Sequence, residues 1–173
     1  YGKGLVHKGK EIIFPNWATY KEEPEGYDYV FYGLDWGFND PFAIVKLTIS
    51  DNNLYIRQIM YASGVEDFQF VIDLLLKEPL LTEQKTYLVC DTSEPRSIIS
   101  LRNAGLPAIK PKKGHGSILD GIRKVCNLSC SGCNRFNNYK FKIDERTETI
   151  LDVPEDKNNH GCDAIRYPLI TFL

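Results

Sequence analysis

Three aspartates stand where the chain passes from one predicted element to the next. Asp35 and Asp91 each end a predicted strand, and Asp163 lies in the first turns of the last predicted helix. In an open sheet with strand–helix units, sites form where the carboxyl ends of strands meet the N-termini of helices. Three converging carboxylates repel one another, and divalent cations such as Mg²⁺, which prefers oxygen ligands, remove that repulsion. The spacing therefore indicates a shared metal site, although each aspartate alone also fits a turn, a helix cap or the surface.

The predicted elements that would position these aspartates are three strands, followed by alternating helices and strands. Alternating, aromatic-rich segments predict an antiparallel meander of three strands, at residues 29–34, 42–50 and 54–61. Apolar residues at helical spacing predict helices at 66–77, 94–104 and 117–126, with short strands at 86–90 and 107–111 between them. A weak strand at 139–143 and a helix from about Asn159 to Tyr167, limited or kinked by Pro168, complete the chain. This order is typical of an α/β, ribonuclease H-like mixed sheet flanked by helices.

Length and composition are those of one ordinary globular domain. The 173 residues are 43% hydrophobic and 25% charged. Residues 1–28 show no regular period, so we expect a linker or lead-in segment there and one domain over residues 29–173. The chain does not begin with Met, which indicates a fragment of a longer protein. No apolar run approaches the ~20 residues of a membrane helix, so no membrane partner is expected.

The net charge and the number of cysteines bear on two further classes of protein, basic nucleic-acid-binding domains and disulfide-stabilised domains. The formal net charge of −2 counts mildly against a strongly basic nucleic-acid-binding domain, although bound metal ions would restore positive charge at an acidic site. Five cysteines in a chain of this size do not indicate a disulfide scaffold, and reduced thiols are expected.

Four segments combine the proposed ligands with distinctive neighbours: YGLDWGFNDP at 32–41, VCDTSEPRSI at 89–98, KGHGSILDGI at 113–122 and DKNNHGCDAIRY at 156–167. In this order they resemble the motifs of the nuclease domain of large terminase subunits from tailed bacteriophages. Each segment alone is a weak match, but four in the family's order over most of the chain are specific. The resemblance implies a ribonuclease H-like endonuclease that cuts concatemeric viral DNA during genome packaging.

The resemblance also implies ligands, metals and partners. Carried over motif by motif, Asp35, Asp91 and Asp163 would bind two Mg²⁺ or Mn²⁺ ions, and a metal-bound hydroxide would attack in line with the departing 3′ oxygen. The family couples this domain to a packaging ATPase, but no Gly-x-x-x-x-Gly-Lys-Ser/Thr phosphate loop occurs here. The implied partners are double-stranded DNA, the ATPase domain of the same full-length chain, the portal and the small terminase subunit. The implied place of action is the host cytoplasm.

Three further residues are secondary candidates for the site. His160 lies three residues before Asp163, hence on nearly the same helical face, and could orient a water or phosphate or simply begin the helix. Asp156 could be a fourth acidic group or a loop carboxylate. Glu94 could reach a metal through water, or could serve only the dipole of its helix.

A basic segment is the best candidate for contact with DNA phosphates. Five positive charges fall within fifteen residues, opposed only by Asp120: Lys110, Lys112, Lys113, Arg123 and Lys124. Phosphate contacts would suit such a patch, with Lys113 the first candidate. Solvated side chains are the ordinary alternative.

Other interpretations stay open at this point. Cys126, Cys130 and Cys133 have a spacing that could belong to a zinc loop in a non-catalytic interaction module, but a structural zinc site needs a fourth ligand. Another ribonuclease H-like nuclease, such as a junction resolvase or an RNA-hybrid hydrolase, is an alternative within enzymes. A sugar-kinase or actin-like half would need a second such domain. Trp36, directly after Asp35, is expected in the core or in the wall of the site.

Overall fold

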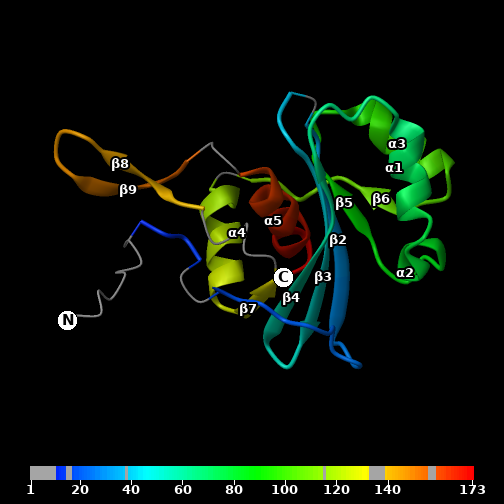
Figure 1. Ribbon diagram of the computed structural model, residues 1–173, viewed down its shortest axis with the longest axis horizontal. Coiled ribbons are helices and arrows are strands. Elements are labelled where there is room, and N and C mark those ends of the chain that lie inside the picture. Colours follow the sequence, from blue (N-terminus) through cyan, green and yellow to red (C-terminus); the bar gives the residue numbers. More distant parts are fainter. Residues whose placement is uncertain (1–10, 15–16, 38, 115, 133–138, 156–158) are drawn as a thin grey trace, which may run out of the picture.

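A seven-stranded mixed sheet with the strand order β1-β7-β4-β3-β2-β5-β6 runs through the molecule (Figure 1). The computed structural model describes residues 11–14, 17–37, 39–114, 116–132, 139–155 and 159–173. The strands of this sheet are β1 (Trp17–Ala18), β2 (Tyr29–Asp35), β3 (Phe42–Ser50), β4 (Asn53–Ala62), β5 (Leu88–Cys90), β6 (Ala108–Ile109) and β7 (Ser129–Gly132). A separate hairpin joins β8 (Phe141–Asp144) to β9 (Thr149–Pro154).

Helices cover both faces of the sheet, as Figure 1 shows. They are α1 (Phe68–Leu75), α2 (Pro79–Thr82), α3 (Pro95–Asn103), α4 (Ser117–Cys126) and α5 (His160–Phe172). One core cluster joins apolar residues of α4 and α5 to β3 and β4, and the other joins α1, α2 and α3 to β2, β3 and β5. The predicted α/β, ribonuclease H-like mixed sheet is confirmed.

The predicted three-stranded meander is present. β2 pairs antiparallel with β3, and β3 with β4. The turn between β3 and β4 uses Asp51 and Asn52 at φ of 48° and 63°, a left-handed conformation that Asp and Asn tolerate better than most residues. β5 then lies parallel to β2 on its other side, and its three residues are fully buried, as the unbroken apolar run predicted.

Several elements differ from the sequence prediction. β7 follows α4, where the sequence predicted no strand. It forms because its backbone pairs in parallel with β4. β9 was not predicted either, because its apolar residues Ile150, Leu151 and Val153 do not alternate with polar ones, and all three side chains are exposed. The short elements β1 and α2 also carry no periodic signal.

Helix α5 continues past Pro168, where the sequence predicted a limit or a kink. Pro168 has no N–H, so the carbonyl of Ala164, four residues earlier, receives no helical hydrogen bond from it. That carbonyl oxygen lies against Gly33 of β2, and a Cβ on Gly33 would come within 1.7 Å of it. The bare backbone of Gly33 therefore lets α5 pack directly on the strand that ends at Asp35.

Every helix in the described part of the chain falls short of the length and hydropathy that crossing a bilayer requires.

Candidate metal centre at the carboxyl edge of the sheet

Asp35 and Asp91 lie side by side because their strands are parallel neighbours. Leu34 of β2 is in register with Cys90 of β5, and the backbone N–H of Asp91 donates to the carbonyl of Leu34 at 2.9 Å. Both aspartates therefore emerge at the same edge of the sheet. The sequence predicted this arrangement on the condition that the two strands were adjacent.

Asp163 approaches the same edge from α5. The helix packs across β2 at Gly33, which brings the first turn of α5 beside the end of that strand. The negative charge of Asp163 is close enough to help raise the pKa of Asp35. The three aspartates, widely separated in sequence, thus meet where β2, β5 and α5 converge.

The Asp35 carboxylate is buried, with 5% of the residue exposed. One oxygen, Oδ2, lies 2.7 Å from Nδ1 of His160, and the other, Oδ1, accepts a hydrogen bond of 2.9 Å from the hydroxyl of Tyr167. Burial raises the pKa of Asp35 to about 6, although the His160 and Tyr167 hydrogen bonds favour its charged form and act in the opposite direction. His160 therefore contacts this carboxylate directly.

The Asp91 carboxylate is held by a cation instead. Its Oδ1 forms an ion pair with the ammonium of Lys113, and its Oδ2 accepts the backbone N–H of Ser93 at 3.1 Å. Burial acts to raise the pKa of Asp91, but the hydrogen bonds from Lys113, Ser93 and the Thr92 backbone, with the charge of Lys113, outweigh it and lower the pKa to about 2. The indole N–H of Trp36 also donates to the backbone carbonyl of Asp91 at 2.7 Å. Lys113 therefore reaches into the acidic cluster.

The Asp163 carboxylate is paired within its own helix. Its Oδ1 accepts from Nη2 and Nε of Arg166, at 2.7 and 3.2 Å, and its Oδ2 lies 3.4 Å from Nδ2 of Asn159. Arg166 is almost fully buried, so this ion pair is shielded from solvent. In the sequence, Arg166 is marked only by its place in the fourth motif and by its three-residue spacing after an aspartate on a helix.

Tyr167 stands at the centre of the cluster. Its hydroxyl bonds to Asp35, and the ammonium of Lys113 lies 4.5 Å from the centre of its ring. Burial, together with the charges of Asp35, Asp163 and Asp91, raises the pKa of Tyr167 far above its ordinary value, so the hydroxyl keeps its proton and donates. Nothing in the sequence marks this tyrosine beyond its place in the fourth motif.

The residues present suit a hard cation, although they do not form a finished coordination shell. In the described part of the chain, no three His, Cys, Asp or Glu side chains lie close enough together to hold an ion. Each carboxylate has its own partner: His160 and Tyr167 for Asp35, Lys113 for Asp91, and Arg166 for Asp163. The donors are nevertheless carboxylate oxygens, which Mg²⁺ and Mn²⁺ accept. The buried Oδ1 of Asn159, beside Asp163, adds an oxygen without a hydrogen-bond partner among the described residues.

The other predicted site residues lie farther out. Glu94 is exposed and immediately precedes α3, where it lines a cavity next to Trp36. Asp156 lies outside the described residues. The exposed residues of the basic segment are Lys110, Lys112, Lys113 and Arg123. Lys124 is half-buried and lies 3.8 Å from Asp120 one turn earlier in α4. The backbone N–H of Lys112 donates to the hydroxyl of Thr171 at 3.2 Å, which ties this segment to α5.

Cys126 is the member of the proposed zinc loop whose side chain the structure describes. The thiol of Cys126 lies 3.4 Å from the carbonyl oxygen of Ile13. Cys133 and the side chain of Cys130 lie outside the described residues. Cys90 and Cys162 are buried in the two core clusters as free thiols.

A mixed sheet of this order, with acidic side chains where β2, β5 and α5 meet, defines a ribonuclease H-like domain. The family model described as "Terminase RNAseH like domain" matches residues 35–170, and the chain belongs to this family.

Individual large terminases are similar to this chain in sequence and in structure. The large terminase subunit of Bacillus phage SPP1 is 28% identical over 155 residues, which are 82% of this chain and 36% of that protein. The chain thus spans about a third of the length of this curated relative. The crystal structure of the large terminase nuclease domain from bacteriophage SPP1 with bound Mn superposes with a TM-score of 0.74 at 24% identity, covering 90% of this chain and 96% of that one. A large terminase from a thermophilic bacteriophage, in complex with ATP-gamma-S, has a TM-score of 0.73 at 22% identity over 94% of this chain and 45% of that one.

Proposed function

We propose that this chain is the metal-dependent endonuclease domain that cleaves concatemeric viral DNA during genome packaging. The observation that supports the proposal most directly is the convergence of Asp35, Asp91 and Asp163 around Tyr167 at one edge of the sheet. Membership of the terminase family makes viral DNA the expected substrate and favours this function over a junction resolvase or an RNA-hybrid hydrolase.

Asp35, Asp91 and Asp163 are the proposed ligands of Mg²⁺ or Mn²⁺, and the family resemblance implies two ions. When bound, such ions stabilise the attacking and leaving oxygens of a phosphodiester. Tyr167 holds one oxygen of Asp35 through its hydroxyl, and His160 holds the other. Arg166 fixes the rotamer of Asp163 through a forked contact with a single oxygen. Bound manganese in the SPP1 nuclease domain supports this assignment.

Lys113 has two proposed roles. Its ammonium balances the charge of Asp91, and we expect it to turn to a DNA phosphate when a metal ion takes its place. Lys110, Lys112, Arg123 and Lys124 would contact the phosphates farther along the duplex. The secondary candidates Asp156 and Glu94 remain proposals.

The proposed partners follow from the length of the relatives. The chain spans 36% of the SPP1 large subunit, and the thermophilic-phage protein was solved with an ATP analogue. We therefore expect a packaging ATPase domain in the full-length protein, joined through the lead-in segment of residues 1–28 to the nuclease domain of residues 29–173. Part of that segment, Ile13, Phe14 and β1, packs into the nuclease fold itself. The portal and the small terminase subunit are further proposed partners, at the procapsid in the host cytoplasm.

Plasmid nicking tests the proposal. Supercoiled plasmid is incubated with native protein or Asp91→Ala in the presence of Mn²⁺, Mg²⁺ or EDTA, and the nicked and linear forms are quantified. We expect cleavage by the native protein with either metal, none with EDTA, and at least a hundred-fold loss for Asp91→Ala. Asp73→Asn, an exposed carboxylate on α1, is the matched control and should cleave normally. Equal cleavage by native protein and Asp91→Ala would overturn the assignment.

The same variants address the zinc alternative. Metal analysis of purified native protein and Asp35→Ala separates the two cases. A zinc module would retain one zinc ion in both proteins, whereas a nuclease centre would lose Mn²⁺ binding in the variant.

A further inference from the structure

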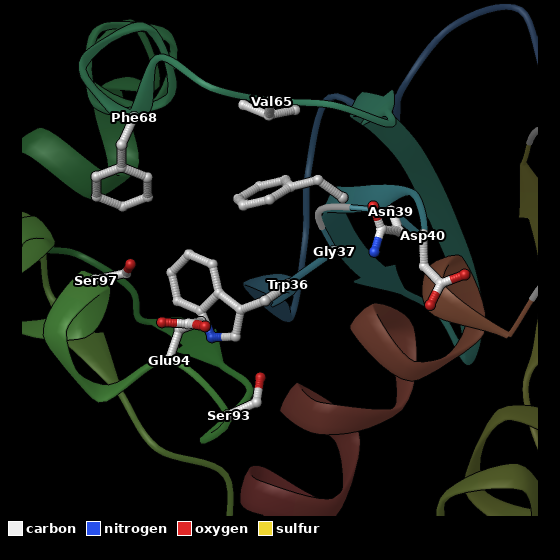
Figure 2. A pocket seen from close by; sticks show the side chains of 10 residues that line it. Trp36, Gly37, Asn39, Asp40, Val65, Phe68, Ser93, Glu94 and Ser97 are labelled. Atoms are coloured by element: carbon white, nitrogen blue, oxygen red, sulfur yellow. The ribbon is translucent and has the colours of Figure 1, made fainter.

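A cavity of about 480 Å³ lies beside the candidate metal centre, and the proposed function does not use it (Figure 2). Its aromatic wall is formed by Trp36, Phe42 and Phe68. Its polar side is formed by Ser93, Glu94 and Ser97, at and just before the start of α3. The volume falls within the range typical of sites for small organic groups.

The cavity and the metal centre share a wall. Trp36 directly follows Asp35, and its indole N–H donates to the backbone carbonyl of Asp91 at 2.7 Å. Ser93 lines the cavity, and its backbone N–H bonds to the carboxylate of Asp91. A DNA strand with its phosphate at the aspartates would therefore carry a neighbouring nucleotide to the mouth of the cavity.

The aromatic wall is held in place by its own packing. The rings of Trp36 and Phe42 meet edge to face with centroids 5.4 Å apart, and those of Trp36 and Phe68 are tilted at 5.9 Å. Figure 2 shows Phe68 and Trp36 beside one space, with Val65 across the top. Aromatic surfaces of this kind stack with nucleobases of any sequence.

The polar side determines which planar group fits. In Figure 2 the side chains of Ser97, Glu94 and Ser93 follow one another beside and below Trp36. Asn39 lies across from them, and the carboxylate of Asp40 points away from the rings. The described lining residues include two carboxylates and no lysine or arginine. A phosphate would be repelled here. A neutral ring that donates N–H hydrogen bonds to carboxylate, amide or hydroxyl oxygens would be accepted.

We propose that this cavity binds one unstacked nucleobase of the DNA strand that crosses the metal centre. The inference rests on the proposed nuclease function and adds a sequence preference to it. Adenine, cytosine and guanine carry an exocyclic amino group that can donate to Glu94, whereas thymine offers only its ring N3–H. Cleavage is therefore biased toward phosphates whose neighbouring base has such an amino group.

Base binding is measured without metal, on a chain in which Trp36 is the only tryptophan. The sequence contains two, so Trp17→Phe supplies this background. Single-stranded tetranucleotides of deoxyadenosine or thymidine are titrated while the emission of Trp36 is followed. We expect quenching by both strands, with at least five-fold tighter binding of the deoxyadenosine strand. An unchanged emission spectrum at saturating oligonucleotide would overturn the proposal.

Two pairs of variants locate the binding. Ser97→Tyr fills the cavity, and Ile99→Tyr places the same side chain on an exposed position of α3. Phe68→Ala removes part of the wall, and Phe70→Ala removes an exposed ring from the same helix. Ser97→Tyr and Phe68→Ala should each weaken binding about ten-fold, and the two control variants should not. Circular dichroism confirms that each variant is folded. Equal binding by Ser97→Tyr and Ile99→Tyr would contradict the proposal.

Cleavage of duplexes that contain one abasic nucleotide then tests base binding in the cavity separately from the proposed nuclease activity. With Mn²⁺, the native protein should cut a duplex with the abasic nucleotide at one position beside the scissile phosphate at least ten-fold more slowly than the intact duplex. Ser97→Tyr should cut the intact and the abasic duplexes at equal rates. Base binding by a protein that cuts no DNA would support the cavity and refute the nuclease. Efficient cutting that no abasic position affects would refute the cavity and support the nuclease.

Discussion

The hydroxyl of Tyr167 donates a hydrogen bond of 2.9 Å to the carboxylate of Asp35, across 132 residues of sequence. The same ring lies under the ammonium of Lys113, which pairs with Asp91. One tyrosine on α5 therefore connects the strand ends of β2 and β5. Asp35, which we propose as a metal ligand, is therefore positioned by this neutral side chain as well as by its own strand.

Replacing Tyr167 with Phe removes that hydroxyl and keeps the ring. We expect the Mn²⁺ concentration for half-maximal plasmid nicking to rise about ten-fold, because groups that orient metal ligands typically contribute ten- to hundred-fold to affinity or activity. Metal-dependent nicking measures the effect, with Tyr20→Phe, whose ring packs on Tyr55, as the control. Unchanged metal dependence in Tyr167→Phe would show that the hydrogen bond does not position Asp35.

Replacing Lys113 with Gln removes the cation that occupies Asp91. In the absence of DNA, we expect Mn²⁺ affinity to rise up to about five-fold, because the ion no longer competes with a partly exposed ammonium. DNA affinity should fall, and the slope of its salt dependence should decrease by about one. Calorimetry with Mn²⁺ and binding titrations at several salt concentrations measure the two effects.

Lys112→Gln is the matched control for this variant. Lys112 is exposed next to Lys113, so its replacement should leave Mn²⁺ affinity unchanged. A decrease of Mn²⁺ affinity in Lys113→Gln would show instead that the ammonium supports the metal centre.

Replacing Arg166 with Met leaves the Asp163 carboxylate without its buried partner. We expect the free energy of unfolding to fall by about 3–5 kcal/mol, the usual cost of removing one member of a buried ion pair. Saturating Mn²⁺ should restore more stability to this variant than it adds to the native protein, since the ion supplies the missing positive charge. Urea unfolding with and without Mn²⁺ measures both quantities.

Arg123→Met provides the comparison for Arg166→Met. Arg123 is exposed on α4, and its loss should change stability by no more than about 0.5 kcal/mol. If the two variants were equally stable, the Arg166–Asp163 pair would have no structural importance.

Replacing Gly33 with Ala tests the contact between β2 and α5. The new Cβ would lie 1.7 Å from the carbonyl oxygen of Ala164, which belongs to the helix backbone and cannot move alone. We expect a loss of more than about 3 kcal/mol in the free energy of unfolding. Gly26→Ala, where the new Cβ meets nothing within 4 Å, should stay within about 1 kcal/mol of native. Thermal or urea unfolding that finds both variants alike would refute the close packing.

The sequence predicted the elements whose signals are local. Helical spacing placed the third predicted helix at residues 117–126, where α4 lies, and alternation marked the meander of β2, β3 and β4. β7 and β9 were missed because their strand character depends on pairing with distant segments or within an exposed hairpin. The four ordered motifs also indicated the terminase family, which the family match confirms.

By itself the sequence determined the fold class, the family and the placing of Asp35 and Asp91 at strand ends, because periodicity and short motifs are properties of neighbouring residues. Only the tertiary structure decided which partner each carboxylate has: Tyr167 and His160 for Asp35, Lys113 for Asp91, and a buried Arg166 for Asp163. These contacts depend on how closely α5 approaches β2, and that distance is set by the bare backbone of Gly33.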